Sequence, residues 1–259
     1  MKIVIADDES LVRAYLSSLI EEMEPCNEIV GKASNGLELI SLVKTHQPDI
    51  VFVDIKMPKL NGLEAISTLK DSYPQIQWVI LTGFPEFEYA QEAIKLGVSH
   101  YLLKPVVVDE LREVFKELVR RNRESIIMLN KEFEYGLTAF FFESGGYPEE
   151  AEDNILPSSQ FYSMVFIFDS SMDEKRKAQY QLQFSRSIKA KISEFADINS
   201  RIAFIMLPNS NFLFVGAWGT EGKQAGKQPI ERLAKAIEQT ALQLSNMSFR
   251  TTILKADLC

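Results

Sequence analysis

Acidic, hydroxyl and lysine side chains follow short apolar runs in the first half of the sequence, at the point where each run ends. Asp7 and Asp8 follow the first run, Asp54 lies late in the third, and Thr82 and Lys104 end the fourth and fifth. Carboxylates that converge on one crevice repel each other, so either one is protonated or a cation lies among them. Oxygen ligands of this kind suit Mg²⁺, which keeps several waters and binds few carboxylates.

A cation beside a carboxylate also prepares that carboxylate to attack a phosphoryl group. The ion shields both anions and holds the phosphoryl oxygens, while a lysine and a hydroxyl take up the remaining charge. The product of such an attack is an acyl phosphate. Taken singly, each of these residues more often belongs to a solvated turn, caps a helix or carries a surface charge than performs chemistry. The prediction therefore depends on their joint position at four strand ends.

The apolar runs alternate with amphipathic stretches, which predicts five strands and five helices. The expected strands are Lys2–Ala6, Ile29–Ala33, Asp49–Ile55, Trp78–Thr82 and Tyr101–Leu103. The expected helices are Ser10–Glu24, Asn35–Thr45, Leu60–Asp71, Glu86–Leu96 and a fifth that begins at Glu110, with Asp109 as its cap. This alternation is typical of an α/β domain with a doubly wound five-stranded parallel sheet. In such a sheet, ligands bind outside the carboxyl ends of the strands, where the polar residues lie.

The polar residues belong to five short motifs that occur in a fixed order. They are Asp7-Asp8, Asp54, the motif Met57-Pro58-x-x-Asn61-Gly62 that follows it, Leu81-Thr82-Gly83 and Tyr101-Leu-Leu-Lys104-Pro105. With these motifs, residues 1 to about 123 resemble the flavodoxin-like receiver domain of bacterial two-component response regulators. The resemblance covers nearly half of the chain.

The resemblance implies a role for each acidic position. Asp54 matches the aspartate that takes a phosphoryl group from a sensor histidine kinase. Asp8, Asp54 and the main-chain carbonyl of Lys56 match the Mg²⁺ ligands, and Asp7 matches the acid that reaches the metal through water. The only enzymatic acts expected of such a protein are phosphoryl transfer to its own Asp54 and slow self-dephosphorylation.

The resemblance also implies roles for the remaining positions. Thr82 matches the hydroxyl that turns toward the phosphoryl group, Lys104 the cation that pairs with it, and Tyr101 the aromatic that swings inward as a switch. The Lys104-Pro105 bond is expected to be cis. In the family, the switching surface consists of the fourth helix, the fifth strand and the fifth helix.

The fifth helix is expected to continue beyond the receiver as a heptad stripe. The stripe consists of Phe115, Val119, Asn122, Ile126, Leu129, Phe133, Gly136 and Phe140. A stripe with a single polar member is typical of a coiled-coil seam. Two interpretations are equally open, namely a homodimer through this extension and packing of the stripe against the chain's own second domain.

The predicted domains are a receiver at 1–123, a helical extension and linker at 124–159, and a smaller α+β domain at 160–259. The last domain is expected to contain strands Phe161–Asp169, Arg201–Leu207, Phe212–Trp218 and Phe249–Leu254, and helices Lys177–Phe195 and Ile230–Leu244. The order βαββαβ predicts a ferredoxin-like fold. It resembles the degenerate GGDEF-like middle domain of AraC-type response regulators. The hairpin at Pro208–Asn211 lacks the acidic pair and the glycine pair, which disfavours cyclase activity and favours a role in oligomerisation or signal transmission.

Composition excludes several classes of function. The 259 residues carry a formal charge of −8, so the chain is a poor non-specific binder of nucleic acid. Cys26 and Cys259 form no disulfide framework, and His46 and His100 are too few for a histidine metal site. No run approaches the length of a membrane helix and no signal peptide is present, so a cytoplasmic protein is expected.

The sequence therefore predicts a response regulator whose phosphorylation controls transcription. DNA would be bound only through a C-terminal domain absent here, and the chain is expected to be a fragment of a longer regulator or one that has lost its output. The alternative is a stand-alone receiver and interaction module that controls a protein partner without DNA. The stimulus, the cognate kinase and the target genes cannot be predicted from the sequence.

Overall fold

The computed structural model describes residues 1–23, 27–83, 86–142, 159–169, 174–196, 198–219, 227–248 and 250–258. The chain forms two compact units, Met1–Arg123 and Glu124–Cys259. Residues 143–158 of the predicted helical extension and linker, together with Cys26 and Cys259, lie outside the described residues. Over the described part of the chain, no helix combines the length and the apolar character needed to cross a membrane.

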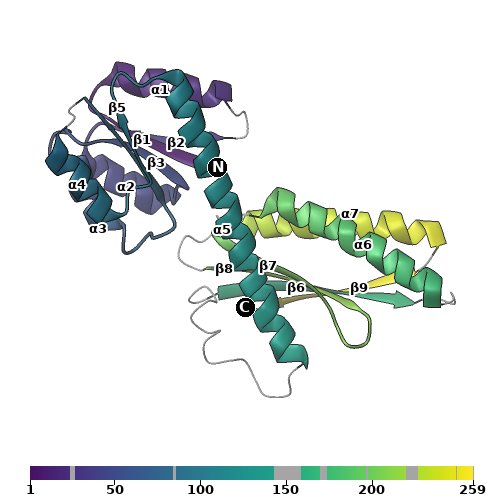
Figure 1. Cartoon of the computed structure of the whole chain (residues 1–259). Coiled ribbons are helices and arrows are strands. Elements are labelled where there is room, and N and C mark those ends of the chain that lie inside the picture. The colour runs from purple at the N-terminus through teal and green to yellow at the C-terminus, as the bar shows by residue number, and fades with distance from the viewer. Residues whose placement is uncertain are drawn as a thin grey trace. The chain divides into compact units, whose positions relative to one another are not determined.

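The first unit is built on a five-stranded parallel sheet, as predicted (Figure 1). The strands are β1 (Lys2–Ala6), β2 (Glu28–Ala33), β3 (Ile50–Asp54), β4 (Gln77–Thr82) and β5 (His100–Leu103). They are ordered β2-β1-β3-β4-β5, and every neighbouring pair is parallel. The strand order reverses at β1, which lies between β2 and β3, so a crevice is expected beyond the carboxyl ends of β1 and β3.

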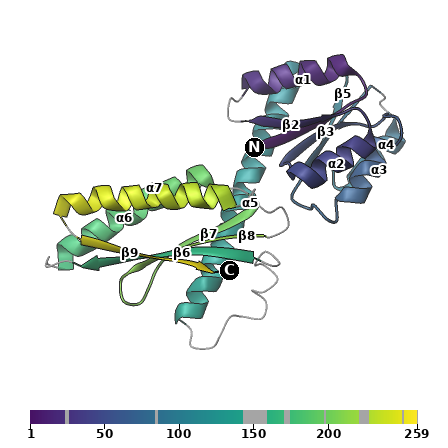
Figure 2. The ribbon, with the colours of Figure 1, turned by 180° about the vertical axis from the view of Figure 1, so that it is seen from behind.

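Helices cover both faces of this sheet (Figure 2). They are α1 (Ser10–Met23), α2 (Gly36–His46), α3 (Gly62–Leu69), α4 (Phe87–Leu96) and α5 (Val108–Phe142). Apolar side chains of α2, α3 and α4 share one core cluster with one face of the sheet, and those of α1 and α5 share another with the opposite face. In β3, Val51 and Val53 enter the first cluster, whereas Ile50 and Phe52 enter the second. This burial on both faces explains the nearly continuous apolar run in the sequence.

Several predicted helix starts differ from the structure by one to three residues, and for two helices of the first unit the residues at the helix start give the reason. Helix α3 begins at Gly62 rather than Leu60. The Asn61 side chain accepts a hydrogen bond from the Glu64 amide, and the Glu64 side chain accepts one from the Asn61 amide. This capping box fixes the first turn. Helix α5 begins at Val108, so Asp109 lies in its first turn and pairs with Arg112 at 2.7 Å instead of capping a helix at Glu110.

The second unit contains a four-stranded antiparallel sheet and two helices that pack on one of its faces. The elements are β6 (Ser159–Asp169), α6 (Glu174–Phe195), β7 (Ser200–Met206), β8 (Phe212–Gly219), α7 (Lys227–Ser248) and β9 (Arg250–Leu258). The strands are ordered β7-β8-β6-β9. Phe166 of β6 and Phe184 of α6 are fully buried, with ring centroids 5.2 Å apart in a core that α7 also enters. The order of helices and strands is the one expected from the sequence.

The other face of this sheet is covered by the second half of α5. Phe133 is 4% exposed and packs against Ile205, Leu213 and Val215, and Leu137 lies beside the same cluster. The Asn130 side chain accepts a hydrogen bond of 2.9 Å from the main-chain amide of Ile202 in β7. This part of the predicted stripe therefore packs within the chain and is not a dimer seam.

The members of the predicted heptad stripe have different surroundings along α5. Its first member, Phe115, belongs to the core of the first unit, and Asn122 is buried. Its last member, Phe140, is half exposed. The heptad spacing therefore indicates an amphipathic helix, but different parts of the chain cover the helix along its length. The spacing alone does not show which parts these are.

His100 is a partly buried histidine at the start of β5. Its Nε2 lies 3.6 Å from Oε2 of Glu117 in α5. Burial lowers the pKa of His100 below its ordinary value of 6.5, and the negative charge of Glu117 opposes this shift only in part. The neutral imidazole is therefore the form that the folded unit favours.

This lowered pKa predicts a pH-dependent stability. The unfolded chain binds the proton more readily than the folded unit, so stability is complete above about pH 6.5 and is lost as the pH falls through the folded pKa. In a His46→Gln background, where His100 is the only histidine, we expect His100→Gln to reduce this loss. Urea unfolding at several pH values measures the difference. If the free energy of unfolding fell equally steeply with decreasing pH with and without His100, the prediction would be contradicted.

Candidate functional site

The predicted polar residues lie at the carboxyl ends of four strands of the first unit. Asp7 follows β1, Asp54 and Thr82 are the last residues of β3 and β4, and Lys104 follows β5. Asp54 pairs in register with Leu81 and Thr82 with Leu103, so the three strand ends are adjacent. The side chains of Asp7, Asp54 and Thr82 are all buried. The sheet therefore brings a lysine, a hydroxyl and two buried acids to one edge.

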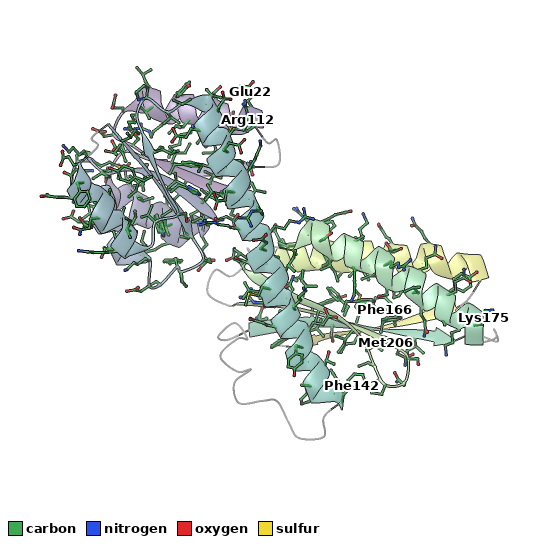
Figure 3. All side chains as sticks on the ribbon, viewed as in Figure 1. Glu22, Arg112, Phe142, Phe166, Lys175 and Met206 are labelled. Atoms are coloured by element: carbon green, nitrogen blue, oxygen red, sulfur yellow. The ribbon has the colours of Figure 1, made fainter. Side chains whose placement is uncertain are left out.

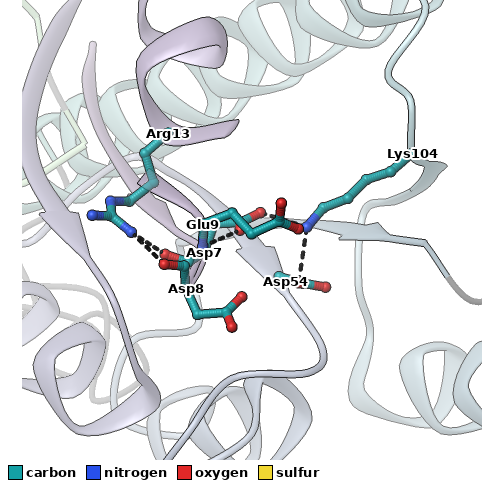
Figure 4. A network of polar contacts seen from close by, with 6 residues as sticks. All are labelled: Asp7, Asp8, Glu9, Arg13, Asp54 and Lys104. Atoms are coloured by element: carbon teal, nitrogen blue, oxygen red, sulfur yellow. Dashed lines mark hydrogen bonds and ion pairs between the residues drawn. The ribbon is translucent and has the colours of Figure 1, made fainter. Parts of the chain in front are cut away.

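The ammonium group of Lys104 lies between the carboxylates of Asp7 and Asp54 (Figure 4). Its Nζ is 2.6 Å from Asp7 Oδ2 and 2.8 Å from Asp54 Oδ2. Burial by itself lowers the pKa of Lys104, but its hydrogen bonds to Asp54 and Asp7, and their negative charges, outweigh burial and raise that pKa. Lys104 is therefore held as a cation, and it partly neutralises two acids that would otherwise repel each other.

Asp54 is 6% exposed, and its two carboxylate oxygens differ in their surroundings. Oδ2 accepts the hydrogen bond from Lys104, whereas Oδ1 is buried and accepts none from the described residues. Burial raises the pKa of Asp54, and the hydrogen bond and positive charge of Lys104 offset this only in part. A buried carboxylate oxygen without a hydrogen bond destabilises the fold. Such an atom is therefore typical of a site that stores strain or binds a ligand.

The main chain positions Lys104 and leaves little room beside Asp54. The Lys104 amide donates a 2.8 Å hydrogen bond to the Thr82 carbonyl, and the Lys104-Pro105 bond is cis as predicted. A Cβ atom added to Gly62 would collide with the main-chain oxygen of Asp54. Glycine at this position therefore permits the close approach of α3 to the end of β3.

Two residues that sequence reasoning missed organise the acidic turn after β1. Glu9 follows Asp7 and Asp8, and carboxylate oxygens of these three residues lie within 4.8 Å of one another. The Glu9 amide donates a 3.0 Å hydrogen bond to Asp7 Oδ1. The Arg13 guanidinium donates to the main-chain carbonyls of Asp7, at 2.5 Å, and Asp8, at 3.1 Å. Glu9 could have been found from the acidic run, but no sequence signal distinguishes Arg13 from an ordinary surface arginine.

Lys56 and Tyr101 lie beside the site rather than in the acidic cluster. The Lys56 ammonium is 3.3 Å from Oε1 of Glu86 and 5.8 Å from the ring centroid of Tyr89. Tyr101 is half buried, and its pKa is raised by burial and further by the charges of Glu86 and Tyr89. The predicted switch tyrosine and the side chain of Lys56 are therefore both near the start of α4.

Comparison with known proteins identifies the first unit and extends beyond it. Residues 3–116 match the family model of the response regulator receiver domain. The chain is 30% identical over 202 residues to the positive alginate biosynthesis regulatory protein of Pseudomonas aeruginosa. The aligned residues cover 78% of this chain and 79% of that protein. The chain belongs to the response regulator receiver family. It is therefore a two-component response regulator, and its site residues occupy the carboxyl edge of its receiver domain.

Other relatives match a shorter part of this response regulator. The uncharacterized transcriptional regulatory protein YesN of Bacillus subtilis is 42% identical over 125 residues, which cover 47% of this chain and 34% of that protein. An uncharacterized response regulatory protein of Staphylococcus epidermidis is 37% identical, and the match covers 54% of each chain. The response regulator thus spans a third to about half of the length of these relatives. The solved REC domain of AraT from Geobacillus stearothermophilus is 38% identical, covers 46% of this chain and 93% of that one, and has a TM-score of 0.43.

Proposed function

We propose that this response regulator is a phosphorylation switch in which Asp54 accepts a phosphoryl group from a sensor histidine kinase. The observation that carries the proposal is the geometry of Asp54. Its Oδ2 is held by Lys104 at 2.8 Å, and its Oδ1 is buried and accepts no hydrogen bond from the described residues. A fixed carboxylate with one unengaged oxygen is arranged to act as a nucleophile.

The proposed step transfers the phosphoryl group without any change in oxidation state. A carboxylate oxygen of Asp54 attacks the phosphorus of a phosphohistidine, the phosphorus–nitrogen bond breaks, and the imidazole leaves with the electron pair and takes up a proton. An acyl phosphate remains on Asp54. Lys104 pairs with the added negative charge, and the Thr82 hydroxyl donates to a phosphoryl oxygen. In this proposal, Tyr101 moves inward when Thr82 is engaged.

The acidic residues fit a bound Mg²⁺. Asp7, Asp8 and Glu9 offer carboxylate oxygens within 4.8 Å of one another, and the unpartnered Oδ1 of Asp54 is a further hard oxygen ligand. We propose that Asp8, Asp54 and the main-chain carbonyl of Lys56 hold the ion and that Asp7 acts through water. When bound, the ion supplies positive charge that shields the carboxylate and the incoming phosphoryl oxygens from each other.

We propose that the output of the switch is regulation of transcription. This proposal is supported by relatives whose names include transcriptional regulatory protein, among them YesN and CitT of Bacillus subtilis. The second unit would transmit the signal. Its βαββαβ order favours a ferredoxin-like domain, and the hairpin Pro208–Asn211 lacks the residues that nucleotide cyclisation requires. We therefore propose a degenerate cyclase-like middle domain, as in AraC-type regulators.

Intact mass spectrometry tests the switch. Incubation with acetyl phosphate and Mg²⁺ is expected to add about 80 Da, the mass of one phosphoryl group, and the gain is expected to disappear when EDTA removes the metal. Reduction of the acyl phosphate with borohydride followed by peptide mapping is expected to place the modification on Asp54. Failure of wild type to gain mass with either acetyl phosphate or a phosphorylated kinase, or a modification mapped elsewhere, would overturn the proposal.

A further inference from the structure

The charges of the chain are divided unevenly along its sequence. Residues 160–259 contain 13 Lys and Arg against 9 Asp and Glu, a formal charge of +4, whereas residues 1–159 contain 15 against 27, a formal charge of −12. At physiological salt a charge acts over only about 8 Å. A partner at the surface of the βαββαβ domain therefore interacts with the local charges of that domain rather than with the net charge of the chain.

Helices α6 and α7 carry much of this positive charge on the side that faces away from the sheet. The two helices pack against each other on one face of the sheet (Figure 1). In α6, Arg186 lies two residues from the buried residues Phe184 and Ile188, and in α7 Lys235 lies midway between two residues of the same core. Two residues correspond to about 200° around a helix. Arg186 and Lys235 are therefore on the side of their helices opposite the core.

Four basic side chains on this outward side form no ion pair with an acid among the described residues. They are all exposed, and they are Lys175, which Figure 3 labels at the start of α6, Arg186, Arg232 and Lys235. The lysines of these helices that do pair with glutamates are Lys189, Lys191 and Lys227. We call the outward sides of α6 and α7 the basic face. Its four unpaired cations favour a partner that is an anion.

The uncharged residues of the basic face indicate the class of anion. Among the described residues they include two exposed large apolar ones, Leu182 and Leu242, and five exposed glutamines. The glutamines are Gln179, Gln183, Gln228, Gln239 and Gln243. Lysine, arginine and glutamine side chains donate hydrogen bonds to the phosphates of nucleic acids. The cores of protein interfaces are rich in aromatic residues, and a membrane-bound helix needs an apolar face, which in α6 and α7 is already buried against the sheet.

We propose that the basic face binds the phosphate backbone of duplex DNA without reading its sequence. Duplex DNA is the phosphate polymer that a transcriptional output requires, so this inference rests on the proposed function. Contacts to phosphates position a protein on the duplex but carry no sequence information directly. If the four unpaired cations each neutralise one phosphate, the logarithm of the association constant falls against the logarithm of the salt concentration with a slope of about −3.6. Affinity is then expected to fall about 150-fold between about 50 and 200 mM salt.

Fluorescence anisotropy of a labelled duplex of random sequence, titrated with the whole chain at several salt concentrations, tests this binding. A variant with both Arg232→Gln and Lys235→Gln is expected to bind at least about tenfold more weakly at low salt, with a slope shallower by about 2. The matched control carries Lys44→Gln and Lys95→Gln, which remove two exposed lysines of the first unit and change the net charge equally. It is expected to bind like wild type. Circular dichroism shows whether each variant is folded.

The proposal is overturned if wild type does not bind the duplex at about 50 mM salt, or if the folded Arg232→Gln, Lys235→Gln protein keeps the wild-type slope. Binding to phosphatidylserine vesicles without binding to DNA, or tighter binding to duplex RNA than to duplex DNA, would overturn it as well. The titration is made without a phosphodonor. Failure to bind DNA therefore leaves the expected mass gain on Asp54 untouched, and failure of that mass gain leaves the DNA titration unchanged.

Discussion

Replacing Asp54 by asparagine is expected to abolish phosphorylation and, at the same time, to make the first unit more stable. The acyl phosphate cannot form on an amide, so no mass gain is expected with any phosphodonor. Stability is expected to rise because burial raises the pKa of Asp54, which means that the ionised carboxylate is disfavoured in the folded unit. An amide of the same shape avoids that cost and can still accept the hydrogen bond from Lys104.

The size of this effect depends on pH. A carboxyl group whose folded pKa is raised contributes stability below its unfolded value of 3.8, and that contribution is lost as the pH rises through the folded pKa. The advantage of Asp54→Asn is therefore expected above the folded pKa of Asp54 and is expected to shrink in acid. We expect a gain on the order of 1 kcal/mol, or about 4 °C in melting temperature.

The chain offers a convenient probe for this measurement. It has two tryptophans, Trp78 in β4 of the first unit and Trp218 in β8 of the second. In a Trp218→Phe background, the fluorescence of Trp78 follows unfolding of the receiver. The exposed residue Asp71 provides the matched control, because Asp71→Asn makes the same chemical change on the surface. A melting temperature for Asp54→Asn equal to or below that of wild type at neutral pH would contradict the prediction.

Replacing Phe133 by alanine is expected to destabilise the second unit by about 3 kcal/mol while leaving the receiver almost unchanged. Phe133 is 4% exposed, and its ring fills the space between α5 and the apolar face formed by Ile205, Leu213 and Val215. Removing a buried aromatic ring forfeits its transfer free energy and leaves a cavity that the rigid sheet cannot close.

Trp218 reports this loss directly. In a Trp78→Phe background, urea unfolding followed at Trp218 is expected to shift to a lower midpoint for Phe133→Ala, whereas unfolding followed at Trp78 in the complementary background is expected to be nearly unchanged. The matched control is Ile127→Ala, which truncates a half-exposed apolar residue of the same helix and is expected to cost less than about 1 kcal/mol. If the urea midpoint fell equally at Trp78 and at Trp218, the prediction that Phe133 stabilises the second unit alone would be wrong.

The receiver could be predicted largely from the sequence because two independent signals coincide there. Runs such as that of β3 indicate strands buried on both faces, and the acids, Thr82 and Lys104 lie where parallel strands share an edge. The ion pairs of Lys104 with Asp7 and Asp54 follow from that shared edge. Arg13 could not be predicted, because its guanidinium contacts main-chain oxygens, and these carry no sequence signature.

The second unit was predicted less completely for a different reason. Periodicity indicates which face of a helix is apolar, but it does not tell what covers that face. The stripe through Phe133 could therefore have been a dimer seam, and only the positions of Ile205 and Leu213 show that part of it is covered within the chain. The same limit applies to Asn130, whose bond to a strand amide depends on how α5 lies against β7.

The bond between Asn130 and Ile202 has a consequence for aggregation. β7 is an edge strand, and the outward amides of an edge strand are a template on which strands of other molecules can add. Here one such amide is already occupied by a helix side chain, and the helix that supplies it also covers the apolar face next to that edge. Any condition that detaches this part of α5 would therefore expose the free amide of an edge strand and the apolar face of the sheet at the same time.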